Sequence, residues 1–339
     1  MPEEPRILSR RSLVTGAGII AGTGLLSSPA KAAPAGHVWS AEYTAKKGSV
    51  ALAMYRKRAD LIDGRRPASG QPVLFLVHGS SLSARTSYDL AVPGLEEYSM
   101  MNVFAGYGFD VWTMDHENYG KSSRTSGNSD IASGAEDLKA GIDLILRETG
   151  RRQVHLFGES SGGLRAGVYA MAHPETVDRL VLAAFTYKGE GSPTLAKRAE
   201  QLDYYRTHNT RLRDRAMIRS IFTRDGLPSA YDPSVAETLA DVELKFGDQV
   251  PTGTYLDMTS KLPLVDPTKV LCPVLMLRGD HDGISTNEDL LDFYRQLPNG
   301  DRQFVILPNV AHSIGYSNNR HMANHMMQAF LTMPPQVAS

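Results

Sequence analysis

A series of short, mainly apolar runs, each followed by glycine or polar residues, constrains the fold of this chain more than any other feature. Val73–Val77 and Val274–Leu277 lack polar alternation, which is typical of strands buried on both faces of a parallel sheet. Helix-like stretches separate the runs, so we predict an α/β fold with a doubly wound, mostly parallel sheet. The predicted strands cover residues 73–77, 110–114, 154–157, 180–185, 274–277 and 303–307, and the predicted helices cover residues 132–149, 161–172 and 318–331.

One long segment, residues 187–262, interrupts the pattern of strands. It is polar and helical in character, and several prolines break it. We therefore predict a helical cap over residues 187–262, inserted after a central strand of a core that residues 33–186 and 263–339 form together. A β-hairpin, with strands over residues 37–44 and 50–55, is expected at the start of this core.

The N-terminus has the pattern of an export signal. The twin arginines Arg10 and Arg11 precede a weakly apolar, glycine-rich stretch over residues 14–26, and Ala30-Lys31-Ala32 supplies a small-x-small cleavage pattern. We expect residues 1–32 to be a twin-arginine signal peptide that the twin-arginine export machinery recognises. The mature protein would then be periplasmic or secreted in a bacterium.

Composition excludes several other classes of protein. The 36 basic and 37 acidic residues show none of the basic excess that nucleic-acid binding requires. The single cysteine, Cys272, excludes an internal disulfide and a cysteine-cluster metal site. No apolar run is long enough for a stable membrane anchor. His321 and His325 have metal-ligand spacing, but an exposed helix face explains them more simply, so we expect no metal or organic cofactor.

The motif with the clearest chemistry is Gly158-Glu159-Ser160-Ser161-Gly162, which fits G-x-S-x-G. It follows an apolar strand and opens a predicted helix, and this context distinguishes it from a chance match. Flanking glycines permit a very tight turn that exposes the Ser160 hydroxyl at a helix N-terminus, where the helix dipole favours negative charge. The alternative is an ordinary loop with a serine helix cap.

A serine nucleophile needs a base that an acid orients, and two later strand ends offer both. His312 follows the last predicted strand and is the candidate base. Asp280 and Asp282 follow the strand before it, and either carboxylate is close enough in sequence to serve as the acid. The pattern G-x-x-D, in which the last residue is the acid, favours Asp282 over Asp280. The order serine, aspartate, histidine along the chain is the one expected for a triad on the predicted α/β sheet.

An acyl transfer also needs donors for the oxyanion. We expect one from the backbone N–H of Ser161 and the other from Ser80, in the loop after the first buried strand, with Ser81 as its alternative. Further candidates lie in or next to three segments: the Gly158–Gly162 turn, called the elbow below, the loop that carries Ser80, and the strand before the cap. The candidate substrate-binding residues are Ser81, Glu159, Tyr187 and Lys188.

With these motifs in place, residues 50–332 resemble the α/β-hydrolase superfamily in its capped form. Glu117 and Asn118 depart from the usual D-x-R-G-x-G-x-S pattern of one loop, which is mostly structural. Serine at position 160 disfavours the haloalkane dehalogenases and epoxide hydrolases of the superfamily, which carry aspartate there. The shared motifs are His78-Gly79, the loop Asp115–Ser122, Gly158–Gly162, Gly279–Asp282 and His312.

These residues and the resemblance predict a serine hydrolase that cleaves carboxylic esters of small molecules through an acyl-enzyme. Amide, lactone or carbon–carbon bond hydrolysis on the same triad is the alternative, and a non-catalytic binding protein is a third. Two interpretations of the cap also stay open. Its aromatic residues either line the pocket or form the cap's own core, and basic residues such as Lys188 and Arg198 either meet a substrate carboxylate or are solvated.

Overall fold

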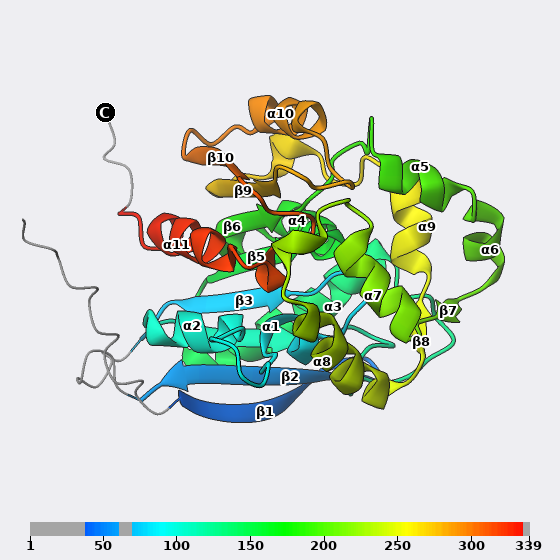
Figure 1. The fold of residues 1–339 in the computed structure, drawn as a ribbon. Helices are drawn as coiled ribbons and strands as arrows, with labels where there is room; N and C mark the ends of the chain where they lie inside the picture. Colours follow the sequence, from blue (N-terminus) through cyan, green and yellow to red (C-terminus); the bar gives the residue numbers. More distant parts are fainter. Residues whose placement is uncertain (1–37, 61–69, 335–339) are drawn as a thin grey trace, which may run out of the picture. The chain divides into compact units, whose positions relative to one another are not determined.

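In the part of the chain that the structure describes, eight strands form one sheet in the order β1-β2-β4-β3-β5-β6-β9-β10 (Figure 1). The β1–β2 and β2–β4 pairs are antiparallel, and the other neighbours are parallel. This mostly parallel sheet confirms the predicted fold class. The strands are β1 (Val38–Lys47), β2 (Val50–Ala59), β3 (Val73–Val77), β4 (Asp110–Met114), β5 (Val154–Glu159), β6 (Val177–Ala183), β9 (Val274–Gly279) and β10 (Arg302–Leu307).

The computed structural model describes residues 38–60 and 70–334. These belong to one unit, Ala35–Ser339. The export signal predicted for residues 1–32 lies outside the described residues. Among the described helices, none combines the length and the apolar character needed to cross a membrane.

Alternate side chains of the central strands enter two separate cores, one on each face of the sheet. Phe75 of β3 packs into the core beneath α3 (Ile131–Thr149), α4 (Ser161–Ala172) and α10 (Asn287–Gln296). Its neighbours Leu74 and Leu76 pack on the opposite face. Because both faces are covered, the strands consist of continuous apolar runs. The second face is covered by α1 (Ala84–Tyr88), α2 (Met100–Gly106) and α11 (Arg320–Leu331).

The hairpin at the start of the core is longer than predicted. β1 and β2 pair without interruption from Val38 opposite Ala59 to Lys47 opposite Val50. The expected turn included Ala45, but this residue is buried in the core, and its burial keeps the backbone in the strand. The short helices α1 and α2, between β3 and β4, were not predicted.

The segment between β6 and β9, predicted as a cap, is helical as expected (Figure 1). The antiparallel pair of β7 (Thr210–Leu212) and β8 (Gln249–Pro251) was not predicted, because strands of three residues are too short to show a pattern. Cap aromatics such as Phe222 pack with Leu82 of the core. The exact cap boundaries remain a prediction. The helices are α5 (Pro193–Ala199), α6 (Leu202–Thr207), α7 (Arg215–Thr223), α8 (Pro233–Glu243) and α9 (Gly253–Ser260).

Candidate active site

Ser160 occupies a strained turn between β5 and α4. Its φ of 58° and ψ of −126° lie in a region that non-glycine residues rarely adopt. The turn is possible because a Cβ at Gly158 would lie 2.4 Å from the Gly162 carbonyl oxygen, and a Cβ at Gly162 would lie 2.1 Å from that of Val77. Glycine at both positions therefore lets the backbone approach closely. The Ser160 hydroxyl donates to and accepts from no other described residue, and it faces a pocket.

His312 and Asp282 meet at the carboxyl ends of β10 and β9. Nδ1 of His312 lies 2.8 Å from Oδ1 of Asp282. The same carboxylate accepts hydrogen bonds from the Ile284 N–H (2.8 Å) and the Ser285 hydroxyl (3.0 Å). Burial raises the pKa of Asp282, but the charge and hydrogen bond of His312 outweigh it and hold that pKa at about 2. Asp282 is thus a buried anion aimed at the imidazole.

Two other aspartates hold the loop that carries His312. The exposed Asp280 accepts hydrogen bonds from the backbone N–H groups of Asn309 (3.0 Å) and Val310 (3.1 Å). Asp225, from the cap, accepts one from the His312 N–H at 3.1 Å. Sequence reasoning missed Asp225, because it belongs to no motif and only the packing of the cap brings it to this loop.

The predicted oxyanion donors lie beside the elbow. The hydroxyls of Ser80 and Ser161 are 2.7 Å apart, and the Ser80 carbonyl accepts a hydrogen bond from the Tyr119 hydroxyl at 2.8 Å. Within the described chain, the backbone N–H groups of Ser80 and Ser161 have no hydrogen-bond acceptor. Two N–H groups without acceptors, one on the loop after β3 and one at the start of α4, are suited to stabilise an oxyanion.

Ser160 and His312 line the same pocket. A small molecule bound there would contact both side chains. Of the candidate residues, Ser80, Ser81 and Glu159 line this pocket, whereas Tyr187 and Lys188 do not. The remaining lining residues are Gly79, Leu82, Ser87, Tyr88, Arg198, Ile221, Arg224, Ser313 and Tyr316.

Tyr187 and Lys188 are turned away by a carboxylate of α10. Asp289 accepts hydrogen bonds from the backbone N–H groups of both residues, each at 2.8 Å. The Tyr187 ring then packs 5.2 Å from that of Phe293, between ring centroids, and the Lys188 ammonium lies 2.5 Å from Asp292. The expectation that these two residues line the catalytic pocket is therefore not met by their positions.

Glu159 links the elbow to the loop of His312. Its Oε1 accepts a hydrogen bond from the Ile314 N–H at 3.1 Å. Burial, with the nearby negative charge of Asp282, raises the pKa of the Glu159 carboxyl to about 7, although the backbone hydrogen bonds oppose both effects. Glu159 is thus a carboxyl group that titrates near neutral pH beside the nucleophile.

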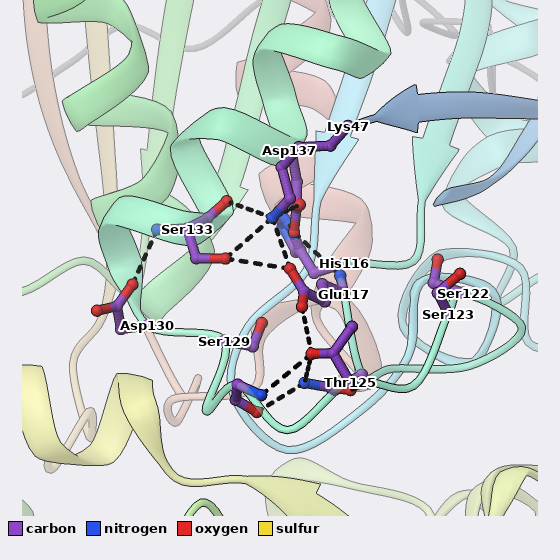
Figure 2. Close-up of polar contacts among 12 residues, drawn as sticks. Lys47, His116, Glu117, Ser122, Ser123, Thr125, Ser129, Asp130, Ser133 and Asp137 are labelled. Carbon is purple, nitrogen blue, oxygen red and sulfur yellow. Dashed lines mark hydrogen bonds and ion pairs between the residues drawn. The ribbon is translucent and has the colours of Figure 1, made fainter. Parts of the chain in front are cut away.

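An ionic cluster surrounds the buried Asp137 of α3 (Figure 2). The Lys47 ammonium of β1 lies 2.5 Å from Asp137 of α3 and 2.7 Å from Glu117. Oδ2 of Asp137 lies 3.1 Å from Nδ1 of His116, whose backbone N–H donates to Nε2 of His78 at 3.1 Å. Burial lowers the pKa of both histidines well below the usual value, so both rings are neutral.

Because Nε2 of His78 accepts that hydrogen bond, Nδ1 carries the proton of the neutral ring. This Nδ1 lies 2.9 Å from the Gly79 carbonyl, so it donates to the residue before Ser80. Glu117, which departs from the usual loop pattern, thus belongs to a cluster that ends at the oxyanion loop. In the described ranges, no group of histidine, cysteine and acidic residues could hold a metal ion, and His321 and His325 are exposed.

Comparison with known proteins supports a family assignment. A model of the family Hydrolase_4, described as serine aminopeptidase S33, matches residues 94–317. A curated hydrolase of 2-hydroxy-6-oxononadienedioate and 2-hydroxy-6-oxononatrienedioate from Paraburkholderia phymatum is 32% identical over 129 residues, which are 37% of this chain and 39% of the relative. A lipase from Caenorhabditis elegans is 34% identical over 113 residues, 29% of this chain and 26% of the lipase.

Each match thus spans well under half of the curated relative's own length. Among solved structures, the enol-lactonase from Burkholderia xenovorans superposes with a TM-score of 0.61 at 17% identity, covering 86% of this chain and 100% of that one. At this identity, the similarity establishes the α/β-hydrolase fold.

Proposed function

The chain belongs to the serine aminopeptidase S33 family (Hydrolase_4) of α/β hydrolases, and from this premise we propose that it cleaves carboxylic esters of small molecules. The observation that carries the proposal is the Asp282–His312 hydrogen bond of 2.8 Å, made by a histidine that shares a pocket with a strained, unpaired serine hydroxyl. This arrangement has the parts of a serine nucleophile with its base and its orienting acid.

In the proposed mechanism, Ser160 Oγ attacks the acyl carbonyl and His312 Nε2 takes the hydroxyl proton. Asp282 fixes the imidazole through Nδ1–H and stabilises the imidazolium that forms. The N–H groups of Ser80 and Ser161 bind the oxyanion. His312 then gives its proton to the leaving alkoxide, which departs as the alcohol. A water molecule, deprotonated by His312, attacks the acyl-enzyme and releases the acid.

One observation favours a small substrate, and another favours an ester. Residues of the cap, Arg198, Ile221 and Arg224, line the pocket beside Ser160, as expected around a small-molecule substrate. A lipase is among the curated relatives. Amide and lactone substrates would use the same residues, so a substrate panel separates them.

A second candidate is hydrolysis of a carbon–carbon bond in a keto acid. The name of the Paraburkholderia phymatum relative specifies an oxo dioate, a compound with a ketone and two carboxylates and no ester. Hydrolysis of such a compound breaks a carbon–carbon bond beside the ketone. Release of a carboxylic acid from a ketone, with no activity on any ester of similar size, would favour this candidate.

The decisive experiment treats the purified protein with a fluorophosphonate and maps the adduct by mass spectrometry. We expect a single adduct on Ser160, and hydrolysis of small p-nitrophenyl esters. Ser160→Ala should lose the adduct and lower kcat by about 10³-fold or more while the circular dichroism spectrum is unchanged. The Ser81→Ala variant, which keeps the nucleophile, is the matched control and should still be labelled. Turnover by Ser160→Ala at the wild-type rate would refute the mechanism.

We also propose that the chain is exported through the twin-arginine pathway, because Arg10 and Arg11 precede an apolar stretch and a cleavage pattern. Replacing both arginines by lysine should retain the precursor in the cytoplasm. Fractionation of cells that express each form, with esterase activity as the readout, tests this. Equal periplasmic activity of both forms would refute it.

A further inference from the structure

Two arginines of the cap, Arg198 and Arg224, line the catalytic pocket. Acidic residues of the described segments do not pair with all of their N–H groups. Arg198 of α5 lies within ion-pair distance of no acidic residue in the described chain, and its guanidinium rests 5.1 Å from the centroid of the Tyr255 ring. Arg224, directly after α7, reaches Oδ1 of Asp225 through Nε at 3.3 Å. Its Nη2 is buried and has no hydrogen-bond partner among the described residues. A buried guanidinium N–H group without an acceptor is costly, so Nη2 of Arg224 indicates a missing acceptor.

The acidic residues near these arginines do not supply that acceptor. Asp225 is shared, because its other oxygen accepts the His312 N–H at 3.1 Å. Glu159 is bound to the Ile314 N–H and makes no hydrogen bond to Arg198 or Arg224. The pocket thus has an excess of positive charge.

This excess continues outward. A neighbouring chamber shares Arg198 and Arg224 with the catalytic pocket, and Lys197 and Arg211 also line it. Asp225 is the only acidic residue that lines the chamber within the described ranges. Like charges that converge on a cleft attract anions and raise their local concentration.

One tyrosine fixes the position of this charge. The guanidinium groups of Arg198 and Arg211 lie 5.1 Å and 4.9 Å from the centroid of the buried Tyr255 ring. The Tyr255 hydroxyl lies 2.8 Å from Oγ of Ser81, in the loop that supplies the proposed oxyanion donor. Arg198 and Arg211 are therefore preorganised by Tyr255, whose hydroxyl is bound to the catalytic loop.

We propose that Arg198 and Arg224 bind a carboxylate of the substrate, so that the enzyme acts on compounds with an acid group a few carbons from the scissile carbonyl. This assignment rests on the proposed hydrolase function and specifies its substrate class. The guanidinium fork matches a carboxylate in two parallel hydrogen bonds. Burial and the charge of Arg224 lower the pKa of Arg198 to about 10, and a bound anion would offset both effects.

The test compares two esters that differ only in charge. The first is mono-p-nitrophenyl glutarate, and the second is p-nitrophenyl 4-carbamoylbutanoate, in which a neutral amide replaces the carboxylate. We expect kcat/KM to be roughly 10- to 100-fold higher for the glutarate ester. Arg198→Gln should remove this preference by slowing only the glutarate ester, while the amide ester changes by less than about 3-fold.

Arg219→Gln is the matched control, because Arg219 also belongs to the cap but is exposed and paired with Glu237. It should leave both substrates unchanged. Arg198→Lys keeps the charge and should retain part of the preference, which guards against a folding defect in Arg198→Gln. A second readout needs no turnover: free glutarate should slow fluorophosphonate labelling of Ser160, and glutaramide should not.

Equal rates for the two esters, or an Arg198→Gln variant that slows both equally, would overturn the carboxylate site. Preference for an ester that carries a phosphate over the carboxylate would overturn the assignment to a carboxylic acid. Failure of the hydrolase function itself is distinguishable, because Ser160 would then remain unlabelled by fluorophosphonate and neither ester would be cleaved.

Discussion

The carboxylate of Asp282 accepts a hydrogen bond of 2.8 Å from Nδ1 of His312, and this pairing separates two aspartates that lie two residues apart. Asp280 instead holds the backbone of Asn309 and Val310. One carboxylate therefore orients the imidazole, and the other shapes the loop that presents it. The two roles lead to different expected effects of the same substitution.

Asp282→Asn should lower kcat by about 10³- to 10⁴-fold, because the amide cannot stabilise the imidazolium and favours the wrong tautomer. Asp280→Asn should change kcat by less than about 10-fold and act mainly on stability, because it weakens two backbone hydrogen bonds. Steady-state kinetics on a p-nitrophenyl ester and thermal melts of both variants check this. If the two variants lost activity equally, the assignment of the acid would be wrong.

Gly162→Ala should destabilise the protein by about 3 kcal/mol or more, because its Cβ would lie 2.1 Å from the Val77 carbonyl oxygen. That oxygen belongs to the backbone of a central strand and cannot move aside. Gly106→Ala is the matched control, because nothing lies within 4 Å of the added Cβ. Urea denaturation measures both, and equal midpoints would show that the elbow is less tightly packed than described.

Local backbone constraints explain which parts of the site were predictable. The glycines around Ser160 and the polar residues after β9 and β10 leave a trace in sequence, because the turn and the strand ends require them. Asp225 and Arg224 leave none, since only the packing of the cap brings them to His312. Tyr187 was expected near the site because it follows a strand. The chain turns there instead, because Asp289 binds its N–H.

The raised pKa of Glu159 predicts a pH dependence of stability. Its carboxyl titrates at about 7 in the folded protein and near the ordinary value of 4.5 in the unfolded chain. Between pH 4.5 and about pH 7, the folded protein keeps a proton on Glu159 that the unfolded chain releases. The stabilisation that this proton gives is therefore complete below pH 4.5 and is lost as the pH rises through about 7.

Glu159→Gln cannot ionise and should remove this decline, which amounts to at most about 3 kcal/mol. Thermal melts from pH 4.5 to pH 8 should therefore show a smaller fall for the variant than for the wild type. Glu148→Gln, at an exposed position of α3, should keep the wild-type fall. Parallel curves for wild type and Glu159→Gln would contradict the assignment.

The buried cluster of Lys47, Asp137 and His116 predicts a cost of removing a single charge (Figure 2). The Asp137 side chain is 0% exposed and its carboxylate lies 2.5 Å from the Lys47 ammonium. Lys47→Gln would leave that carboxylate without a cation, beside the negative Glu117. We expect a loss of about 3 kcal/mol in the free energy of unfolding.

Lys139→Gln is the matched control, because it also removes a lysine from an ion pair, here with Asp143 of α3. Both side chains of this pair are nearly half exposed, at 45% and 48%. Water replaces the lost partner at that site, so the variant should change stability by less than about 0.5 kcal/mol. Activity adds a second readout, because the cluster continues through His116 and His78 to the oxyanion loop. Lys47→Gln should therefore lower kcat while KM changes little, when measured below the temperature at which it begins to unfold. A variant that was destabilised but kept the wild-type kcat would show that the cluster supports the fold alone.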